Sequence, residues 1–206
     1  MTGANRRTDQ LAETLAQQIL TGQLPIGSKM PSDAALCAQY NVSRTILREA
    51  FRLLTAKGLL VARPRIGTLV APRQNWALLD RDMLAWRVKA GDSLAMAAEI
   101  HDLRLALEPS LAALAAARAD EKANQALQNA LRILETDPHS EAAFIGAFYH
   151  AAANEMAACM AHLAQWAVQQ RTTPLPLTAY RQLTAAVAQN DKPTARISAL
   201  NALVDA

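Results

Sequence analysis

The stretch from Asn41 to Gly58 predicts the helix on which the rest of the chain depends. Ser43 can cap it by accepting a backbone N–H two or three residues further on, and Gly58 can end it in a left-handed conformation. At about 100° per residue, apolar side chains fall on one side and a row of arginines falls on another. The apolar side holds Leu47, Ala50, Phe51 and Leu54, and the basic side holds Arg44, Arg48 and Arg52. The apolar side of this helix is expected to be buried in a protein core, whereas the basic side attracts anions.

A row of arginines alone is also typical of an ordinary solvated helix face. The segment before it favours a functional interpretation. Ser32 can cap a shorter helix, Asp33 to Tyr40, and Asn41 is a turn residue between the two helices. Two capped helices joined by a tight turn predict a helix-turn-helix.

A β-hairpin is predicted directly after the second of these helices. Residues 59–63 and 68–70 are β-prone runs, and the tetrapeptide Pro64-Arg65-Ile66-Gly67 joins them. This spacing predicts a hairpin that carries Arg63 and Arg65 near its tip. A hairpin in this position is the wing of a winged helix-turn-helix.

Two segments precede the helix-turn-helix. Residues 1–7 predict a mobile basic arm, and Thr8 can cap a first helix that Gly22 is placed to stop. The segment 24–31 has two prolines and a glycine, which indicates an ordered connection and not a helix. Lys29 can reach a phosphate from this connection, although a solvated lysine explains it equally well.

Positive charge is concentrated in the N-terminal third of the chain. Residues 1–73 contain ten basic and four acidic residues, a net charge of +6, whereas the remaining residues contain eleven basic and fourteen acidic ones, a net charge of −3. A polyanion is attracted to the first part and mildly repelled by the second. The N-terminal part is therefore the candidate for binding nucleic acid.

Composition favours a helical protein. Alanine and leucine dominate, and aromatic residues make up only 4% of the sequence, so helix packing is favoured over a β-sandwich. The first ten residues lack the apolar core of a signal peptide, and no run approaches the roughly 20 apolar residues that cross a bilayer. We therefore predict a cytoplasmic protein in which both cysteines, Cys37 and Cys159, are reduced.

The run LPIGSKMPSDAALCAQYNVSRTILREAFRLLTAKGLLVARPRIGTLVAPR resembles the winged helix-turn-helix of the GntR family of bacterial transcription regulators. The following pieces, NWALLDRDMLAWR and DLRLALEPSLAALAAARA, are similar to the FadR-type branch of that family, and above all to its sugar-acid-responsive members. The resemblance implies that the second half of the chain is an all-helical effector-sensing domain. It covers nearly the whole chain and weakens after residue 120.

The predicted architecture is mainly α and has two domains. Residues 1–73 form the winged helix-turn-helix with its small hairpin, residues 74–80 form a linker, and residues 81–206 form an all-α helical bundle for effector sensing and dimerisation. Trp76 and Trp86 are expected to pack the two domains together. Helices of the second part are predicted over about 81–89, 93–118 with a bend at Pro109, 120–135, 141–157, 159–171, 177–190 and 192–204.

The N-terminal turn of the second helix is the predicted reader of DNA. Arg44 and Arg48 are best placed to enter the major groove, where an arginine can donate two hydrogen bonds to guanine. The resemblance implies DNA contacts by Ser43, Arg44, Thr45 and Arg48, and by the wing residues Arg63 and Arg65. Two departures from many relatives, Ala34 in place of an arginine and Arg65 in place of a glycine, prevent the operator sequence from being inferred from them.

Polar residues on the alanine-rich helices of the second half are candidates for sensing. His101, Arg104 and Glu108 share one helix face, and Gly146, His150 and Asn154 share another. A cavity between such helices can bind a small carboxylate, with Arg104 as its ionic partner. Ordinary structural roles explain the same spacing. The predicted effector-binding residues are Arg104, His150, Asn154 and Tyr180.

Many members of the FadR-type branch bind a divalent metal through an Asp-x3-His pair and two later histidines. His150 matches the first of these histidines, whereas Gly146, Tyr180 and Ala202 stand where the other three ligands are expected. A single imidazole does not complete a metal site. We therefore predict no metal of the family type and no other cofactor.

The leading functional hypothesis is a homodimeric repressor of a sugar-acid or other organic-acid operon that is released by a small carboxylate effector. Two recognition helices related by a two-fold axis would read a palindromic operator in double-stranded DNA. The alternative is a helical dimerisation protein, tethered to DNA, whose second domain no longer senses a ligand. A hydrolase is disfavoured, because Cys37 belongs to the DNA-binding part and Cys159 has no evident base.

Overall fold

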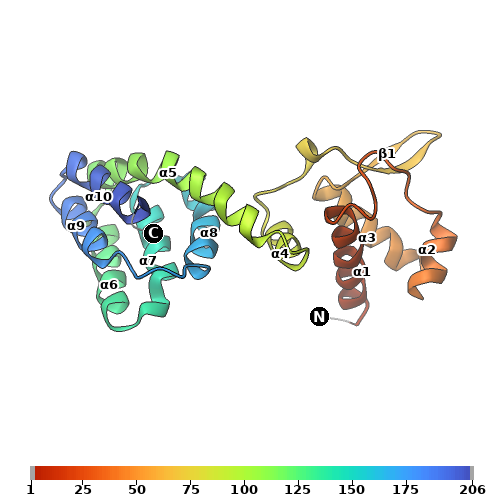
Figure 1. Cartoon of the computed structure of the whole chain (residues 1–206), viewed down its shortest axis with the longest axis horizontal. Helices are drawn as coiled ribbons and strands as arrows, with labels where there is room; N and C mark the ends of the chain where they lie inside the picture. Colours follow the sequence, from red (N-terminus) through yellow and green to blue (C-terminus); the bar gives the residue numbers. More distant parts are fainter. Residues whose placement is uncertain (1–2, 205–206) are drawn as a thin grey trace. The chain divides into compact units, whose positions relative to one another are not determined.

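The computed structural model describes residues 3–204, which separate into two compact units. The division lies between Ser93 and Leu94, and each side of it has a hydrophobic cluster of its own. We refer to the N-terminal unit and the C-terminal unit. Helices and one antiparallel hairpin are the elements of the first, and helices are those of the second (Figure 1). The predicted fold class is thereby confirmed.

Three helices open the N-terminal unit. α1 (Gly3–Leu20) begins ahead of Thr8, so the predicted basic arm is helical from Gly3 onward. α2 (Asp33–Tyr40) and α3 (Arg44–Ala56) have the predicted serine caps. Ser32 Oγ accepts the Ala35 N–H at 3.2 Å, and Ser43 Oγ accepts the Ile46 N–H at 3.3 Å. Each serine satisfies one of the backbone donors that a helix start leaves open.

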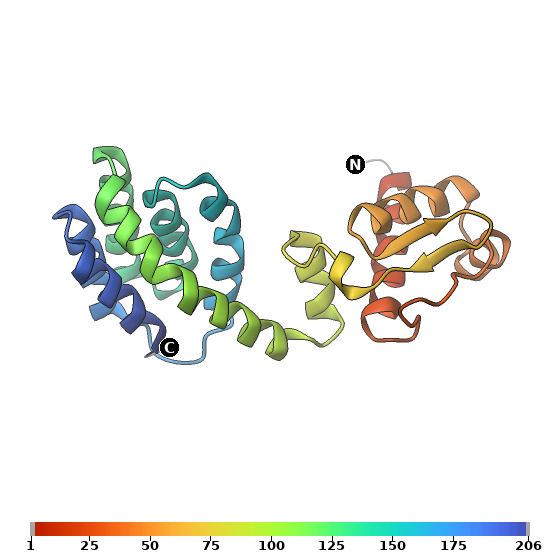
Figure 2. The ribbon, with the colours of Figure 1, turned by 90° about the horizontal axis from the view of Figure 1, so that it is seen from above.

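The hairpin follows α3. β1 (Leu60–Arg63) and β2 (Gly67–Val70) pair antiparallel, with Arg63 opposite Gly67 at the turn, and Figure 2 shows the two strands side by side. The proline-rich connection before α2 also joins this sheet, because the Met30 N–H donates to the Thr68 carbonyl at 2.9 Å. The connection is therefore fixed against the wing.

The apolar side of α3 packs into the core of the N-terminal unit, as its pattern predicts. Leu47 and Leu54 are at most 1% exposed, and they belong to the same cluster as Leu15 of α1 and Leu36 of α2. Burial of each such side chain contributes roughly 1.5–3 kcal/mol to folding. This anchorage fixes the orientation of α3 and leaves its basic side outward.

The N-terminal unit extends beyond the predicted linker. A short 3-10 helix (Arg73–Asn75) and α4 (Arg81–Lys89) follow β2, and Trp76, Met83 and Trp86 all belong to the N-terminal hydrophobic cluster. The structure therefore places residues 74–93 with the DNA-binding part, where we expected a linker over 74–80 and the start of the second domain at 81. The two tryptophans fill the core of the first unit, whereas we expected them to pack two domains together.

Ion pairs also hold α4 in the N-terminal unit. Lys57, which caps the C-terminal end of α3, donates to Asp80 Oδ1 at 2.6 Å and to Asp82 Oδ2 at 2.7 Å. Burial lowers the pKa of Lys57, but the bonds to Asp80 and Asp82 outweigh burial and raise that pKa overall. A second pair joins Lys89 of α4 to Glu13 of α1. α3, α4 and α1 are thus tied together by charge as well as by apolar contact.

Gly58 ends α3 at a position where only glycine fits. Its φ is +73°, and a Cβ built there would lie 1.9 Å from the Asn75 carbonyl oxygen. Alanine at this site meets both backbone strain and a clash with main-chain atoms, so Gly58→Ala is expected to lower the free energy of unfolding by roughly 3 kcal/mol. Urea unfolding measures this loss. Gly22→Ala is the matched control, because Gly22 has φ +78° and nothing within 4 Å of a built Cβ; equal losses in both variants would contradict the clash.

The described part of the C-terminal unit, residues 94–204, holds six α-helices and one short 3-10 turn, Pro138–Ser140, and the first of these helices begins one residue earlier, at Ser93. Figure 1 shows α7 between α6 and α8. α9 packs against both α6 and α10. α5 continues through Pro109 without ending. The helices are α5 (Ser93–Arg118), α6 (Glu121–Thr136), α7 (Glu141–Ala151), α8 (Glu155–Gln169), α9 (Leu177–Ala188) and α10 (Lys192–Val204).

The core of the C-terminal unit combines small residues with a few aromatic rings. Phe144 and Phe148 of α7 are at most 1% exposed, and the Phe144 ring lies 4.5 Å from the ring of Tyr180 on α9. Ala112 and Ala115 of α5 belong to the same cluster and are fully buried. Within residues 3–204, no helix is both long enough and apolar enough to cross a membrane.

Candidate nucleic-acid interface and buried charge cluster

The outward side of α3 carries the predicted DNA-reading residues. Arg44, Thr45 and Arg48 are exposed at the N-terminal end of the helix, whereas Leu47 between them is buried. Within residues 3–204, no carboxylate is paired with Arg44 or Arg48. Two guanidinium groups on adjacent turns of a rigid helix can therefore donate to base edges or phosphates. Arg52, one turn further on, lies 3.7 Å from Glu49 and is partly neutralised.

The wing carries the other predicted cations. Arg63 and Arg65 are both exposed, and Arg65 has φ +63° in a turn closed by the Ile66 N–H donating to the Arg63 carbonyl at 3.2 Å. A side chain at positive φ costs on the order of 1 kcal/mol relative to glycine. The turn therefore holds Arg65 in a strained backbone conformation, and such strained residues are concentrated at functional sites.

Lys29 lies beside the wing. Its backbone forms an isolated bridge with Leu69, and its Cε lies 3.1 Å from a Cβ built at Gly67. The structure therefore brings Lys29 to the same hairpin as Arg63, whose β-partner is Gly67. The sequence indicated a possible phosphate contact for Lys29 but not this proximity, because the pairing joins residues about 40 apart in the chain.

Buried charges lie inside the C-terminal unit. The Arg104 Nε donates to Glu108 Oε1 at 2.6 Å, and its second terminal nitrogen donates to Glu108 Oε2 at 3.3 Å. The two residues are 5% and 3% exposed. Burial lowers the pKa of Arg104, but the Glu108 carboxylate outweighs burial and raises that pKa overall, so Arg104 stays protonated. Tyr149 also donates its hydroxyl to Glu108 Oε1, at 3.1 Å.

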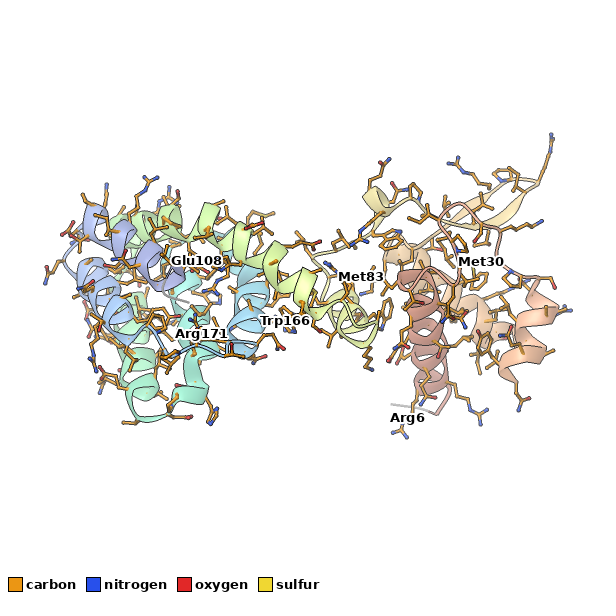
Figure 3. All side chains as sticks on the ribbon, in the orientation of Figure 1. Arg6, Met30, Met83, Glu108, Trp166 and Arg171 are labelled. Carbon is orange, nitrogen blue, oxygen red and sulfur yellow. The ribbon has the colours of Figure 1, made fainter. Side chains whose placement is uncertain are left out.

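A second buried group is formed around Glu141. The Tyr180 hydroxyl donates to Glu141 Oε1 at 2.6 Å, and a terminal nitrogen of Arg171 lies 3.2 Å from the same oxygen. Burial first, and the Glu141 charge second, raise the pKa of Tyr180 well above its ordinary range, so its hydroxyl stays protonated. Figure 3 labels Arg171 and Glu108, both among the helices of this unit. We call Arg104, Glu108, Tyr149, Glu141, Tyr180 and Arg171 the buried charge cluster.

The four predicted effector-binding residues do not gather at one site. Arg104 and Tyr180 belong to the buried charge cluster, whereas His150 is exposed on α7. Asn154 caps α8, where its Oδ1 accepts the Ala157 N–H at 3.1 Å. The reason is local: α7 ends at Ala151 and Ala153 has φ +48°, so the face predicted to continue from His150 to Asn154 is interrupted.

The positions of the family metal ligands are filled by other contacts. A Cβ built at Gly146 would lie 2.6 Å from Gln165 Nε2, which donates to the Ala142 carbonyl at 3.0 Å. Ala202 is buried and Tyr180 is held by Glu141. Within the described part of the chain, no three His, Cys, Asp or Glu side chains are grouped as a metal site. The residues present do not fit a metal of the family type.

Residues 7–70 match the model of the bacterial regulatory proteins of the gntR family. The match covers α2, α3 and the hairpin, whose geometry is that of a winged helix-turn-helix. This N-terminal domain belongs to the GntR family. The predicted family is confirmed for the part of the chain that carries the exposed arginines.

Two curated relatives of this chain come from Escherichia coli K12. The uncharacterised HTH-type transcriptional regulator YieP is 42% identical over 116 residues, which are 55% of this chain and 50% of YieP. The galactonate operon transcriptional repressor is 34% identical over 138 residues, 67% of this chain and 60% of the repressor. The chain thus spans between half and three fifths of these relatives. Both are named as transcriptional regulators and neither as an enzyme, in agreement with the prediction that the chain is not an enzyme.

Two solved structures share the fold of this chain. Streptococcus agalactiae GntR has a TM-score of 0.54 at 22% identity and covers 96% of this chain and 97% of its own. A structure described for Lar of Listeria monocytogenes has a TM-score of 0.53 at 15% identity and covers 99% and 94%. At these identities the likeness concerns the fold alone.

Proposed function

We propose that this protein is a sequence-specific DNA-binding transcription regulator that reads a palindromic operator as a homodimer. The observation that carries the proposal is the exposed trio Arg44, Thr45 and Arg48 on a helix whose opposite side is fixed in a core. Ser43, Lys29, Arg63 and Arg65 supply further donors and charge for the phosphate backbone. A two-fold dimer would place two such helices on successive major grooves.

We further propose that the regulator represses an operon for a sugar acid or a related organic acid. The name of one relative, the galactonate operon transcriptional repressor, supports this class of target. Two buried arginines, Arg104 and Arg171, supply positive charge for a carboxylate in the C-terminal unit. Effector binding would release DNA if the effector has a higher affinity for the DNA-free state.

A second function has its own support. Arg104 and Tyr180, two of the four predicted effector-binding residues, already have internal partners in Glu108 and Glu141. Two residues whose charge and hydroxyl already have internal partners need no ligand, and this favours a C-terminal unit that only dimerises. We also propose that no family-type metal takes part, and a full equivalent of zinc in chelator-washed protein would contradict that.

The test uses the full chain and DNA from upstream of its own gene, with fluorescence anisotropy as the measurement. We expect specific binding to an inverted repeat, and a higher dissociation constant when D-galactonate or another sugar acid is added. Sedimentation of the free protein should give a dimer. Binding that no sugar acid changes would favour the non-sensing alternative, whereas equal affinity for the inverted repeat and for unrelated DNA would refute the proposed regulator.

A further inference from the structure

A cavity of about 320 Å³ lies between α5 and the segment that follows α8. Its polar lining is His101 and Arg104 from α5, and Gln170, Arg171, Thr172 and Thr173 from the end of α8 and beyond. Every one of these side chains can donate a hydrogen bond, and the described residues that line the cavity include no carboxylate. The lining is therefore suited to an anion.

Arg171 brings a buried donor to this cavity. Its side chain is 8% exposed, and its two terminal nitrogens reach Glu141 Oε1 at 3.2 Å and Thr173 Oγ1 at 3.4 Å. The Nε–H is buried and has no acceptor among the residues that the structure describes. A buried charged donor without a partner is costly, and native proteins rarely retain one unless an ion, a water or a ligand satisfies it.

Arg171 lines two cavities. One is the cavity without carboxylates, and the other, of about 270 Å³, is lined by Glu141 together with Arg171. Glu141 holds the guanidinium through one oxygen only, and that oxygen also accepts the Tyr180 hydroxyl. Arg104 differs, because Glu108 holds it through both carboxylate oxygens. Arg171 is thus less fully satisfied than Arg104.

We infer that the 320 Å³ cavity binds a small organic or inorganic oxyanion through Arg171, and that Glu141 is the internal competitor for the same guanidinium. The planar fork of arginine matches a carboxylate or a phosphate, and Gln170 and Thr172 supply donors for further oxygens of the ligand. No metal is needed, because the charge comes from arginine. The regulatory consequence rests on the proposed function, whereas anion binding itself does not.

Isothermal titration calorimetry of the full chain at constant ionic strength tests the inference. The probes are sodium gluconate, inorganic phosphate and the uncharged polyol sorbitol. We expect at least one anion to bind and sorbitol not to bind, and the two anions distinguish a carboxylate ligand from a phosphate ligand. Binding should persist after exhaustive chelation. The inference is overturned if neither anion binds, or if sorbitol binds as well as the anions do.

Two substitutions assign the site. Arg171→Gln should weaken anion binding by about tenfold or more, because one charge-assisted hydrogen bond is worth roughly that factor. Arg181→Gln is the matched control: Arg181 also pairs with a glutamate, Glu135, but is 57% exposed, and its loss should leave binding unchanged. Glu141→Gln should tighten binding, because it removes the competing carboxylate. Equal binding by the Arg171→Gln and Arg181→Gln proteins, or no tightening by Glu141→Gln, would contradict the assignment.

The variant Arg171→Gln leaves Glu141 buried without its cation, which can prevent folding. The double variant Arg171→Gln/Glu141→Gln removes both charges, and it should fold and still fail to bind the anion. DNA titrations of the same proteins separate this inference from the proposed function. Anion binding without specific DNA binding would refute the proposed regulator and support the anion site. Specific DNA binding without anion binding would refute the anion site and support the proposed regulator.

Discussion

Replacing Glu108 with alanine is expected to lower the free energy of unfolding by roughly 3–5 kcal/mol. Glu108 is 3% exposed and is the acceptor for both Arg104 and Tyr149, so its removal leaves a buried cation and a buried hydroxyl without their partner. The cost of an uncompensated charge in the interior exceeds the cost of the lost attraction itself. Urea unfolding followed by far-ultraviolet circular dichroism, which reports the helices, measures the effect.

Two controls separate charge from packing. The double variant Arg104→Met/Glu108→Leu removes both ions at similar volume and should recover most of the stability that the single variant loses. The surface pair Arg181 and Glu135 is the matched comparison: Glu135→Ala should cost about 0–1 kcal/mol, because water screens exposed ion pairs. A loss for Glu108→Ala as small as the loss for Glu135→Ala would show that the buried pair is not important for folding.

Replacing Arg48 with alanine is expected to weaken binding to the specific operator by roughly 1–3 kcal/mol, a factor of about 5 to 150. Arg48 is exposed and lies one turn after the start of α3. Ser43 caps this helix, and the apolar side of the helix fixes its orientation. Its guanidinium can donate twice to a guanine, and a shortened side chain cannot. Arg44→Ala should behave similarly. Anisotropy titrations against the operator and against scrambled DNA measure the loss and show whether it is specific.

Two other arginines provide comparisons. Arg65→Ala should mainly reduce the dependence of binding on salt, by about one unit of slope, because a tip residue neutralises phosphate charge on any sequence. Arg52→Ala should have a small effect on operator affinity, since Arg52 lies further along α3 and forms an ion pair with Glu49. Unchanged operator affinity of the Arg48→Ala protein would exclude α3 as the base-reading element.

Much of the fold could be predicted, because residues close in sequence, such as capping side chains, determine where several helices begin and end. The bounds of α2 and α4 match the predictions: Ser32 caps α2 as predicted, and Asp80, where we expected the linker to end, caps α4. The break between α7 and α8 was mispredicted. It passes through Ala153 at φ +48° without glycine or proline, and its only sequence signal is Asn154, which we took for a ligand instead of a cap.

More residues of the candidate DNA interface than of the buried charge cluster could be predicted, because most of the interface residues are close to one another in the sequence. Arg104 and Glu108, four residues apart on one helix, were predicted to share a face. Arg171, Tyr149 and Glu141 were not singled out, because the contacts that define their roles join residues 30 to 41 apart. Such contacts depend on how helices pack, which spacing within one helix does not encode.

The attachment of Lys57 to Asp80 and Asp82 determines where the chain can be shortened for binding studies. A fragment ending at residue 73 would remove α4 and leave the sites of Trp76, Met83 and Trp86 as an open apolar surface prone to aggregation. A fragment ending at Ser93 keeps those side chains and both carboxylates that hold Lys57. The smallest portion suited to crystallisation with DNA is therefore about twenty residues longer than the GntR-family match, which ends at residue 70.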